Sequence, residues 1–171
     1  MQTKNLIILS LFTAISIVLT RFFSVMLPIT GIAGIRLSFG DIPILLSGIL
    51  FGPLAGALVG ITADIIGAVF LSTFGYFPGF TISAALTGVI PPLAIKIFGT
   101  RKIKVKHIFL SILMTDIVVS LCLNTLWLNV MTGKAFFVLL PPRIIARIIL
   151  IPIATAVVYA LYKKIKNLNL I

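Results

Sequence analysis

The sequence predicts an all-α polytopic membrane protein with six transmembrane helices, and composition and charge placement carry this prediction. Hydrophobic residues make up 60% of the 171 positions, against three acidic and 14 basic residues. A soluble domain carries about a quarter charged residues, so lipid is the expected solvent. Apolar runs separate three basic clusters, which hold Lys4, Lys96, Arg101, Lys102, Lys104, Lys106, Lys163, Lys164 and Lys166.

Six apolar segments are candidates for the spans, because a spanning helix needs about 20 mostly apolar residues. We expect one integral membrane domain over 1–171, with spans at roughly 5–27, 40–53, 54–73, 80–98, 107–131 and 142–163. The first segment lacks a small-residue cleavage site, so we expect it to be retained as a span. The second is the least regular, because Pro43 and Pro53 bracket barely ten uninterrupted residues.

The basic clusters predict the orientation in the cell membrane. Cytoplasmic loops are enriched in Lys and Arg, so the three clusters should share the cytoplasmic side, together with both termini. The segments 28–39, 74–79 and 132–141 then face outward. The net charge of +11 is expected to meet anionic lipid headgroups and not nucleic acid, since most basic residues flank apolar segments.

Small residues recur every fourth position in several spans, and this spacing lets helices approach closely. The longest run comprises Gly48, Gly52, Gly56 and Gly60. Ala84 and Gly88 keep the same period in the fourth span, and Ser10, Ala14 and Val18 keep it in the first. Such seams are expected to pack within the protein, and one that faces lipid would dock another membrane subunit.

Arg143 and Arg147 stand one helical turn apart near the outer end of the sixth span, so they share a face. Two guanidinium groups on one face repel each other unless an anion lies between them. Two interpretations stay open. The arginines form intramembrane pairs with Asp64 or Asp116, or they bind the carboxylate of a ligand, which guanidinium holds through two hydrogen bonds.

The fifth span carries a polar stripe, because its polar residues follow a spacing of four, four and three: Asp116, Ser120, Asn124 and Trp127. Polar groups at membrane depth are expensive, so this face should not point at lipid. It serves either interhelical hydrogen bonding or the recognition of a planar heterocycle, with Trp127 stacking on the ring.

Two further features point to a site on the outer side. The segment 74–80 reads FGYFPGF, and its aromatic residues, Tyr76 and Phe77 among them, suit either an interfacial belt or a lid over an outward-facing pocket. Asp64, near the middle of the third span, has no basic residue nearby on its own helix. It needs a partner from elsewhere, such as Arg21 or an amine of the ligand.

Enzyme classes are poorly supported by the residue inventory. The sequence contains no G-x-x-x-x-G-K-[ST], H-E-x-x-H or G-x-S-x-G motif, no glutamate and a single histidine. We therefore expect no catalytic residues, no metal site, no cofactor and no ATP hydrolysis by this chain. A secondary transporter would normally show internal repeats, and none is detected between the two halves.

Several motifs occur along the chain: IRLSFGDIPI at 35–44, FGP at 51–53 with Gly56, Asp64 with Gly67, GYFPGFT at 75–81, NTLW at 124–127, and Pro142 with Arg143. Together they resemble the motifs of the substrate-binding (S) components of energy-coupling factor (ECF) transporters, and the match is closest to the folate family. The resemblance covers nearly the whole chain.

The resemblance implies a six-helix membrane protein that captures a vitamin in an outward-facing pocket. It implies association with a transmembrane coupling (T) subunit and two cytoplasmic ATPase subunits, and release of the ligand inward after the S component topples in the membrane. The docking motif of the family has alanines at four-residue intervals in the first helix. The equivalent positions here are Ser10, Ala14 and Val18.

Folate, the vitamin that the resemblance favours, fits the residue inventory of this chain. Its two tail carboxylates suit Arg36, Arg143, Arg147 or Lys134, and its flat pterin suits Asp64, Asn124 and Trp127, with Tyr76 and Phe77 in the outer loop. A cationic vitamin such as thiamine fits poorly. Riboflavin and pantothenate remain alternatives, and pantothenate is the closer rival because it is also a carboxylate.

Two other classes of function stay open at this stage. One is a stand-alone secondary transporter coupled to protons through Asp64 and Asp116. The other is a membrane assembly subunit that uses its glycine seams and binds no ligand.

Overall fold

Helices dominate the computed structural model, which describes residues 3–29, 32–71, 76–99 and 103–167, without the side chains of 25–37 and Leu71. The elements in chain order are α1 (Thr3–Arg21), β1 (Val25–Ile29), β2 (Ile32–Leu37), α2 (Asp41–Phe51), α3 (Pro53–Leu71), α4 (Pro78–Ile97), α5 (Val105–Thr115), η1 (Asp116–Leu123), α6 (Asn124–Thr132) and α7 (Phe136–Asn167).

Five helical stretches are long and apolar enough to cross a membrane: α1, α3, α4, the continuous run α5–η1–α6, and α7. They correspond to the first, third, fourth, fifth and sixth predicted spans, and they confirm the helical membrane class. The second predicted span is a helix of 11 residues. At 1.5 Å per residue α2 is about 16 Å long, too short to cross a core of about 30 Å alone.

The short helix α2 lies inside the bundle, where it contacts α1, α3, α4 and α7. Its residues from Ile42 to Gly48 are all buried, which explains why the helix is apolar on every side. It ends at Gly52, whose φ of 94° is readily adopted only by glycine. Pro53 then opens α3 at the first helical position, where its missing N–H costs nothing.

The first predicted span is too long at its C-terminal end. Helix α1 ends at Arg21, and the chain then forms an antiparallel hairpin in which Val25 lies opposite Leu37 and Met26 opposite Arg36. The register shifts at Pro28, which has no N–H to donate to the ladder. Strand β2 contacts α7, so the hairpin packs against the bundle. It then leads into α2.

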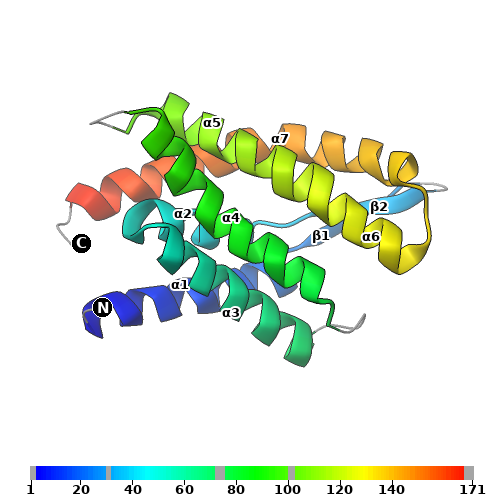
Figure 1. The fold of residues 1–171 in the computed structure, drawn as a ribbon, viewed down its shortest axis with the longest axis horizontal. Coiled ribbons are helices and arrows are strands. Elements are labelled where there is room, and N and C mark those ends of the chain that lie inside the picture. The colour runs from blue at the N-terminus through cyan, green and yellow to red at the C-terminus, as the bar shows by residue number, and fades with distance from the viewer. Residues whose placement is uncertain (1–2, 30–31, 72–75, 100–102, 168–171) are drawn as a thin grey trace.

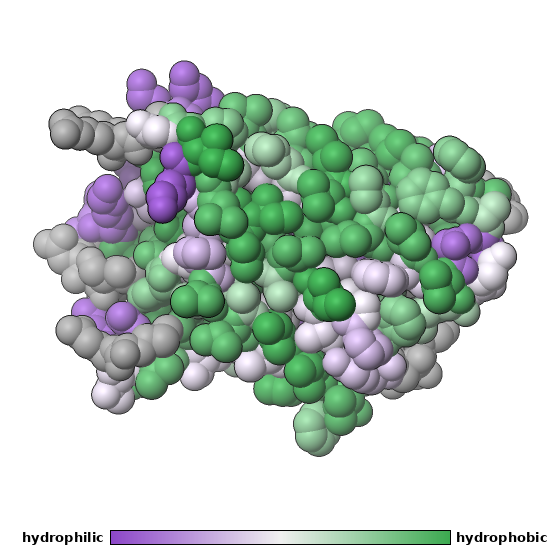
Figure 2. Space-filling view, in the orientation of Figure 1, coloured by the Kyte–Doolittle hydropathy of each residue, from purple (hydrophilic) through white to green (hydrophobic). Residues whose placement is uncertain are grey.

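The connections between helices lie at the two ends of the bundle, in the grouping that the charge pattern predicted. Figure 1 shows the start of α1, the end of α7, the α2–α3 turn and the start of α5 at one end, and the hairpin and the α6–α7 connection at the other. In Figure 2 apolar residues cover the surface between hydrophilic ends. Large apolar side chains such as Leu54 and Phe137, both 81% exposed, contribute to this surface, as expected for contact with lipid.

The predicted glycine seam holds α2, α3 and α4 together. A Cβ on Gly48 or Gly56 would meet the carbonyl oxygen of Gly88, and a Cβ on Gly60 would lie 2.6 Å from the carbonyl carbon of Ala84. Only residues without a side chain permit backbones to approach so closely. Gly52 is the exception to the predicted run, since nothing lies within 4 Å of a Cβ there and the residue makes the turn instead.

Candidate functional site

A charged cluster joins three elements at membrane depth. Nη1 of Arg147 on α7 lies 2.8 Å from Oδ1 of Asp116 on η1 and 3.2 Å from Oδ2 of Asp41 on α2. The side chains of Arg147 and Asp116 are 20% and 12% exposed, so this ion pair is largely sheltered from solvent. Pairing with Asp116 is one of the two interpretations that the sequence left open for the arginines.

Asp41 was not among the predicted site residues. It stands in the first turn of α2, directly after Gly40, where an acidic side chain also complements the helix dipole. Its position in the motif at 35–44 indicated that it could be functional. The spacing of residues in the sequence did not indicate which residue it contacts. The partner lies 106 positions further along the chain, on α7.

Arg143 completes the charged cluster in a different way. Its Nη1 donates a hydrogen bond of 2.8 Å to the backbone carbonyl oxygen of Ser120. Among the described residues, no carboxylate lies within the 4.0 Å of an ion pair with Arg143. Arg143 is half-buried and one turn from Arg147, as predicted. The cluster therefore presents a guanidinium whose charge no described carboxylate balances directly.

The fifth span changes from α-helix to π-helix at Asp116, and the π-helix continues to Leu123. The sequence pattern did not predict this, although π-helical segments frequently occur at functional sites. Asp116 and Ser120 are buried, and Asn124 and Trp127 are half-buried, which confirms that the polar stripe does not point at lipid. Oδ1 of Asn124 is buried and has no hydrogen-bond partner among the described residues. A buried acceptor of this kind suits a donor supplied by a ligand.

Trp127 packs against the beginning of α4. Its Nε1–H donates to Oγ of Ser83 at 3.2 Å, and its ring centroid lies 5.8 Å from that of Phe77. The indole reaches α4 because Gly79 has no side chain: a Cβ there would lie 2.6 Å from Cδ2 of Trp127. Phe77 also makes an edge contact with Phe80. Phe77 and Phe80 therefore form a packed group with Trp127.

Asp64 on α3 faces α4, where Oγ1 of Thr81 donates to its Oδ2 at 2.7 Å. The hydroxyl of Tyr76 lies 3.1 Å from the same threonine oxygen, so the outer loop is tied to α3 through Thr81. The guanidinium of Arg21 lies beside Gly67, one turn along α3 from Asp64. Arg21, one of the partners that the sequence suggested for Asp64, therefore lies beside the same helix.

The described site residues form two groups inside the bundle. The charged cluster comprises Asp41, Asp116, Arg143 and Arg147, and the ring cluster comprises Asp64, Tyr76, Phe77, Thr81 and Trp127. Asn124 belongs to the same run of the fifth span as Asp116 and Trp127. This combination of cation, unsatisfied acceptor and aromatic surface suits a ligand that has both a carboxylate and a flat polar ring.

Arg36, a predicted site residue, is described by its backbone alone. Its backbone lies on β2, opposite Met26, and β2 contacts α7, but its side chain is outside the described set. Phe74 and Gly75 of the outer loop also lie outside the described residues. Arg36 therefore stays a predicted ligand contact.

The small-residue stripe of α1 points away from the bundle. Ser10 and Ala14 are exposed and Val18 is 44% exposed, whereas Leu9, Phe12 and Ser16 on the opposite face are buried. The hydroxyl of Ser10 bonds back to the carbonyl oxygen of Leu6 at 2.9 Å, so it presents little unsatisfied polarity. This stripe is therefore free of internal helix packing, unlike the seam of α2, α3 and α4.

Comparisons with known proteins agree with this geometry. A family model described as "ECF transporter, substrate-specific component" matches residues 4–162. A protein of Clostridium novyi named "Folate transporter FolT" is 37% identical over 99% of this chain and 94% of its own length. A protein of the same name from Leuconostoc mesenteroides is 26% identical over 94% of this chain and 85% of its own length.

Two solved structures share the fold. The crystal structure of FolT bound with folic acid superposes with a TM-score of 0.78 at 30% identity, and covers 96% of this chain and 95% of that one. The structure of the S component of a bacterial ECF transporter superposes with a TM-score of 0.69 at 24% identity, over 98% of each chain. The second likeness concerns the fold alone.

Proposed function

Because the chain belongs to the family of substrate-specific components of ECF transporters, we propose that it is the component that binds folate. The ligand enters from the hairpin end of the bundle and lies between the charged cluster and the ring cluster. The chain carries out no chemistry on it. Its role is to capture the vitamin on the outer side of the cell membrane and deliver it inward.

The proposal rests on the environment of the Arg143 side chain. Its guanidinium is half-buried in a membrane bundle, yet it is held by a backbone carbonyl and lacks a balancing carboxylate among the described residues. A buried cation of this kind is costly unless an anion arrives. The carboxylates of the folate tail would supply that anion. The two named folate transporters and the folic acid complex support the choice of ligand.

The two arginines of the charged cluster have different roles in this proposal. Arg147 is already paired with Asp116 and Asp41, so it holds α2, η1 and α7 in place. Its positive charge also attracts the carboxylates of the folate tail. Arg143 makes the direct contact. Arg36, carried by β2 beside α7, is the second arginine that we assign to the tail.

The ring cluster receives the pterin. The Asp64 carboxylate is an acceptor for ring amino and amide N–H groups, and the unsatisfied Oδ1 of Asn124 is another. Trp127 and Phe77 offer aromatic surface, and Tyr76, 46% exposed, forms the outer edge. A pocket of this kind selects for a flat ring that carries several donors.

The transport cycle requires partners that supply energy. We assign these roles to a transmembrane T subunit and two cytoplasmic ATPase subunits, and we place the T subunit against the exposed stripe of Ser10, Ala14 and Val18. Small side chains on an outward face let a partner helix approach closely. We assign both termini to the cytoplasm, because cytoplasmic loops are enriched in Lys and Arg.

Calorimetry on the detergent-purified chain tests the ligand assignment. We expect saturable binding of folate at one site per chain, and no comparable heat with pantothenate or thiamine. Tight binding of pantothenate without folate binding would move the assignment to the other carboxylate vitamin. Uptake by the chain alone in liposomes under a pH gradient would instead favour a proton-coupled transporter.

A further inference from the structure

The bundle has a second region with the features of a binding site, at the end opposite the hairpin. Two neighbouring cavities of about 200 and 260 Å³ lie on either side of the last turns of α7 and share Tyr162 and Lys166. The first is bounded by Ile49 and Leu50 of α2, and the second by Ile103, before α5. Neither cavity contains a residue of the charged or ring clusters.

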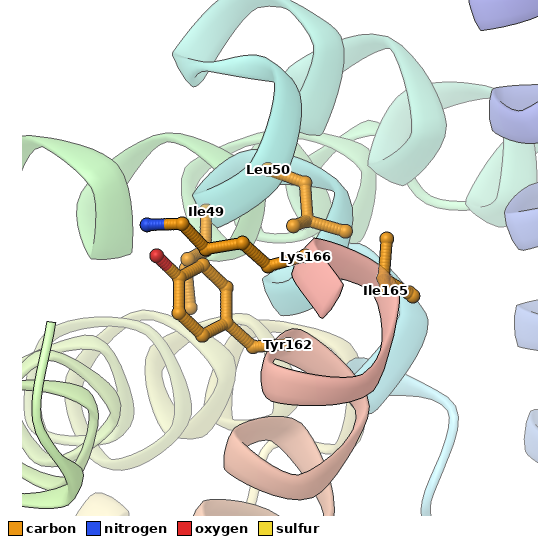
Figure 3. Close-up of a pocket in the computed structure, with 5 residues that line it drawn as sticks. All are labelled: Ile49, Leu50, Tyr162, Ile165 and Lys166. Carbon is orange, nitrogen blue, oxygen red and sulfur yellow. The ribbon is translucent and has the colours of Figure 1, made fainter. Parts of the chain in front are cut away.

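The lining combines cations with apolar surface. Tyr159, Tyr162, Lys163 and Lys166 recur at spacings of three and four, so they share one face of α7. Nζ of Lys166 lies 5.8 Å from the ring centroid of Tyr162. Figure 3 shows the Lys166 ammonium and the Tyr162 hydroxyl at one end of the first cavity with Ile49 behind the Tyr162 ring, and Leu50 and Ile165 toward the other end. Polar groups therefore stand at one end of the cavity, and its other half is apolar.

These lysines have no acidic side chain available at their end of the bundle. The chain contains only three acidic residues, Asp41, Asp64 and Asp116. Two of them pair with Arg147 and the third accepts a hydrogen bond from Thr81. Among the described residues no ion pair involves Lys163 or Lys166, so their ammonium groups are available to an anionic ligand.

From this arrangement we infer that the two cavities form a binding site for one anionic phospholipid in the leaflet at the end where the chain begins and ends. The phosphate is held by Lys163, Lys166 and the Tyr162 hydroxyl. An acyl chain runs along Ile49 and Leu50, between α2 and α7. Basic pockets between transmembrane helices are suited to anionic lipid headgroups. The apolar half distinguishes this site from one for a free phosphate.

Native mass spectrometry of the detergent-purified chain tests the inference. The protein is incubated with equal amounts of phosphatidylglycerol and phosphatidylcholine, and the bound lipids are counted. We expect one phosphatidylglycerol to be retained in preference to phosphatidylcholine. The double variant Lys163→Gln with Lys166→Gln should lower its affinity about 5- to 30-fold, since each lysine near an anionic lipid contributes about fivefold.

A matched control removes the same charge elsewhere at this end of the bundle. The double variant Lys96→Gln with Lys106→Gln alters two exposed lysines that line neither cavity. It should retain phosphatidylglycerol as the unmodified chain does. The variant Leu50→Trp, which fills the apolar half without changing charge, should reduce retention.

Three results would overturn the inference. The first is equal retention of both lipids by the unmodified chain, and the second is equal loss in the two double variants, which would indicate diffuse surface charge. The third is displacement of the lipid by soluble glycerol phosphate at the same concentration, which would indicate a phosphate site without an acyl groove. Unchanged thermal unfolding in all variants shows that the bundle is intact and keeps this test independent of the proposed function.

Discussion

Nη1 of Arg147 lies 2.8 Å from Oδ1 of Asp116, which joins the middle of α7 to the first residue of the π-helix. The same nitrogen lies 3.2 Å from Oδ2 of Asp41, at the start of α2. One guanidinium thus fixes the relative positions of three elements that surround the proposed ligand site. Removal of Arg147 leaves two carboxylates without their shared cation.

Substituting Asp116 by Ala should destabilise the protein strongly. The change leaves Arg147 with the more exposed Asp41 as its remaining carboxylate, and breaking a buried pair from one side costs about 3 to 5 kcal/mol. Thermal unfolding in detergent, followed by circular dichroism, measures the effect. The double variant Asp116→Leu with Arg147→Met should recover most of the stability, because apolar replacements remove both charges. An equal loss in both variants would argue against a role for the pair.

Arg143→Ala should weaken folate binding while the bundle stays folded. Loss of a hydrogen bond to a charged group costs about 1.5 to 3 kcal/mol, which is roughly 10- to 150-fold in affinity. The chain has a single tryptophan, Trp127 in the ring cluster, so quenching of its fluorescence by added folate measures the affinity. Lys164→Ala removes an exposed cation near the C-terminal end of α7 and should change the affinity little. Unaltered affinity in Arg143→Ala would remove this residue from the site.

Gly79→Ala should disturb the ring cluster without a change of charge. The added Cβ would lie 2.5 Å from Cε1 of Phe77 and 2.6 Å from Cδ2 of Trp127, so both rings have to shift. Overpacking of this kind costs about 1 to 3 kcal/mol. We expect a change in the Trp127 emission of the free protein and weaker folate binding. Identical emission and affinity would show that the rings are not held by this contact.

Ala14→Trp should impair assembly and leave ligand binding intact. Ala14 lies on the exposed stripe of α1, away from both clusters, and a bulky side chain there holds a partner helix at a distance. Co-purification with a co-expressed T subunit measures assembly. Ile148→Trp, on an exposed position of α7, is the matched control and should assemble normally. Normal assembly of Ala14→Trp would place the docking surface elsewhere.

Gly56→Ala should destabilise the seam of α2, α3 and α4. A methyl group there would lie 2.8 Å from the carbonyl carbon of Gly88 and would meet backbone, which cannot move aside as a flexible side chain does. We expect a loss of about 1 to 3 kcal/mol. Leu54→Ala on the same helix, 81% exposed, should have little effect on thermal unfolding. Similar midpoints for the two variants would contradict the assigned packing.

Apolar length and charge placement were sufficient to predict the helical membrane class and five helices that are long and apolar enough to cross a membrane. They also grouped the connections at the two ends of the bundle. They failed at α1, which ends at Arg21, because the hairpin that follows is as apolar as a span. The run VMLPITGIAGIRL contains β-branched residues around Thr30 and Gly31, and this was the available signal for a turn between strands.

The site was predicted in part, for a physical reason. Residue spacing places Arg143 with Arg147, and Asp116 with Ser120 and Asn124, on single helix faces. It cannot show which faces meet, so the Asp41–Arg147 contact and the Thr81–Asp64 hydrogen bond were not anticipated. The π-helix at Asp116 has no composition signal of its own.

Identification of the small molecules released when the detergent-purified chain is denatured tests the central claim most directly. Mass spectrometry and the absorbance spectrum together identify the compound and its amount per chain. Protein purified from cells supplied with folate should release a folate in a ratio approaching one per chain, and Arg143→Ala protein should release much less. Release of pantothenate, or no ligand together with no folate binding on titration, would contradict the assignment.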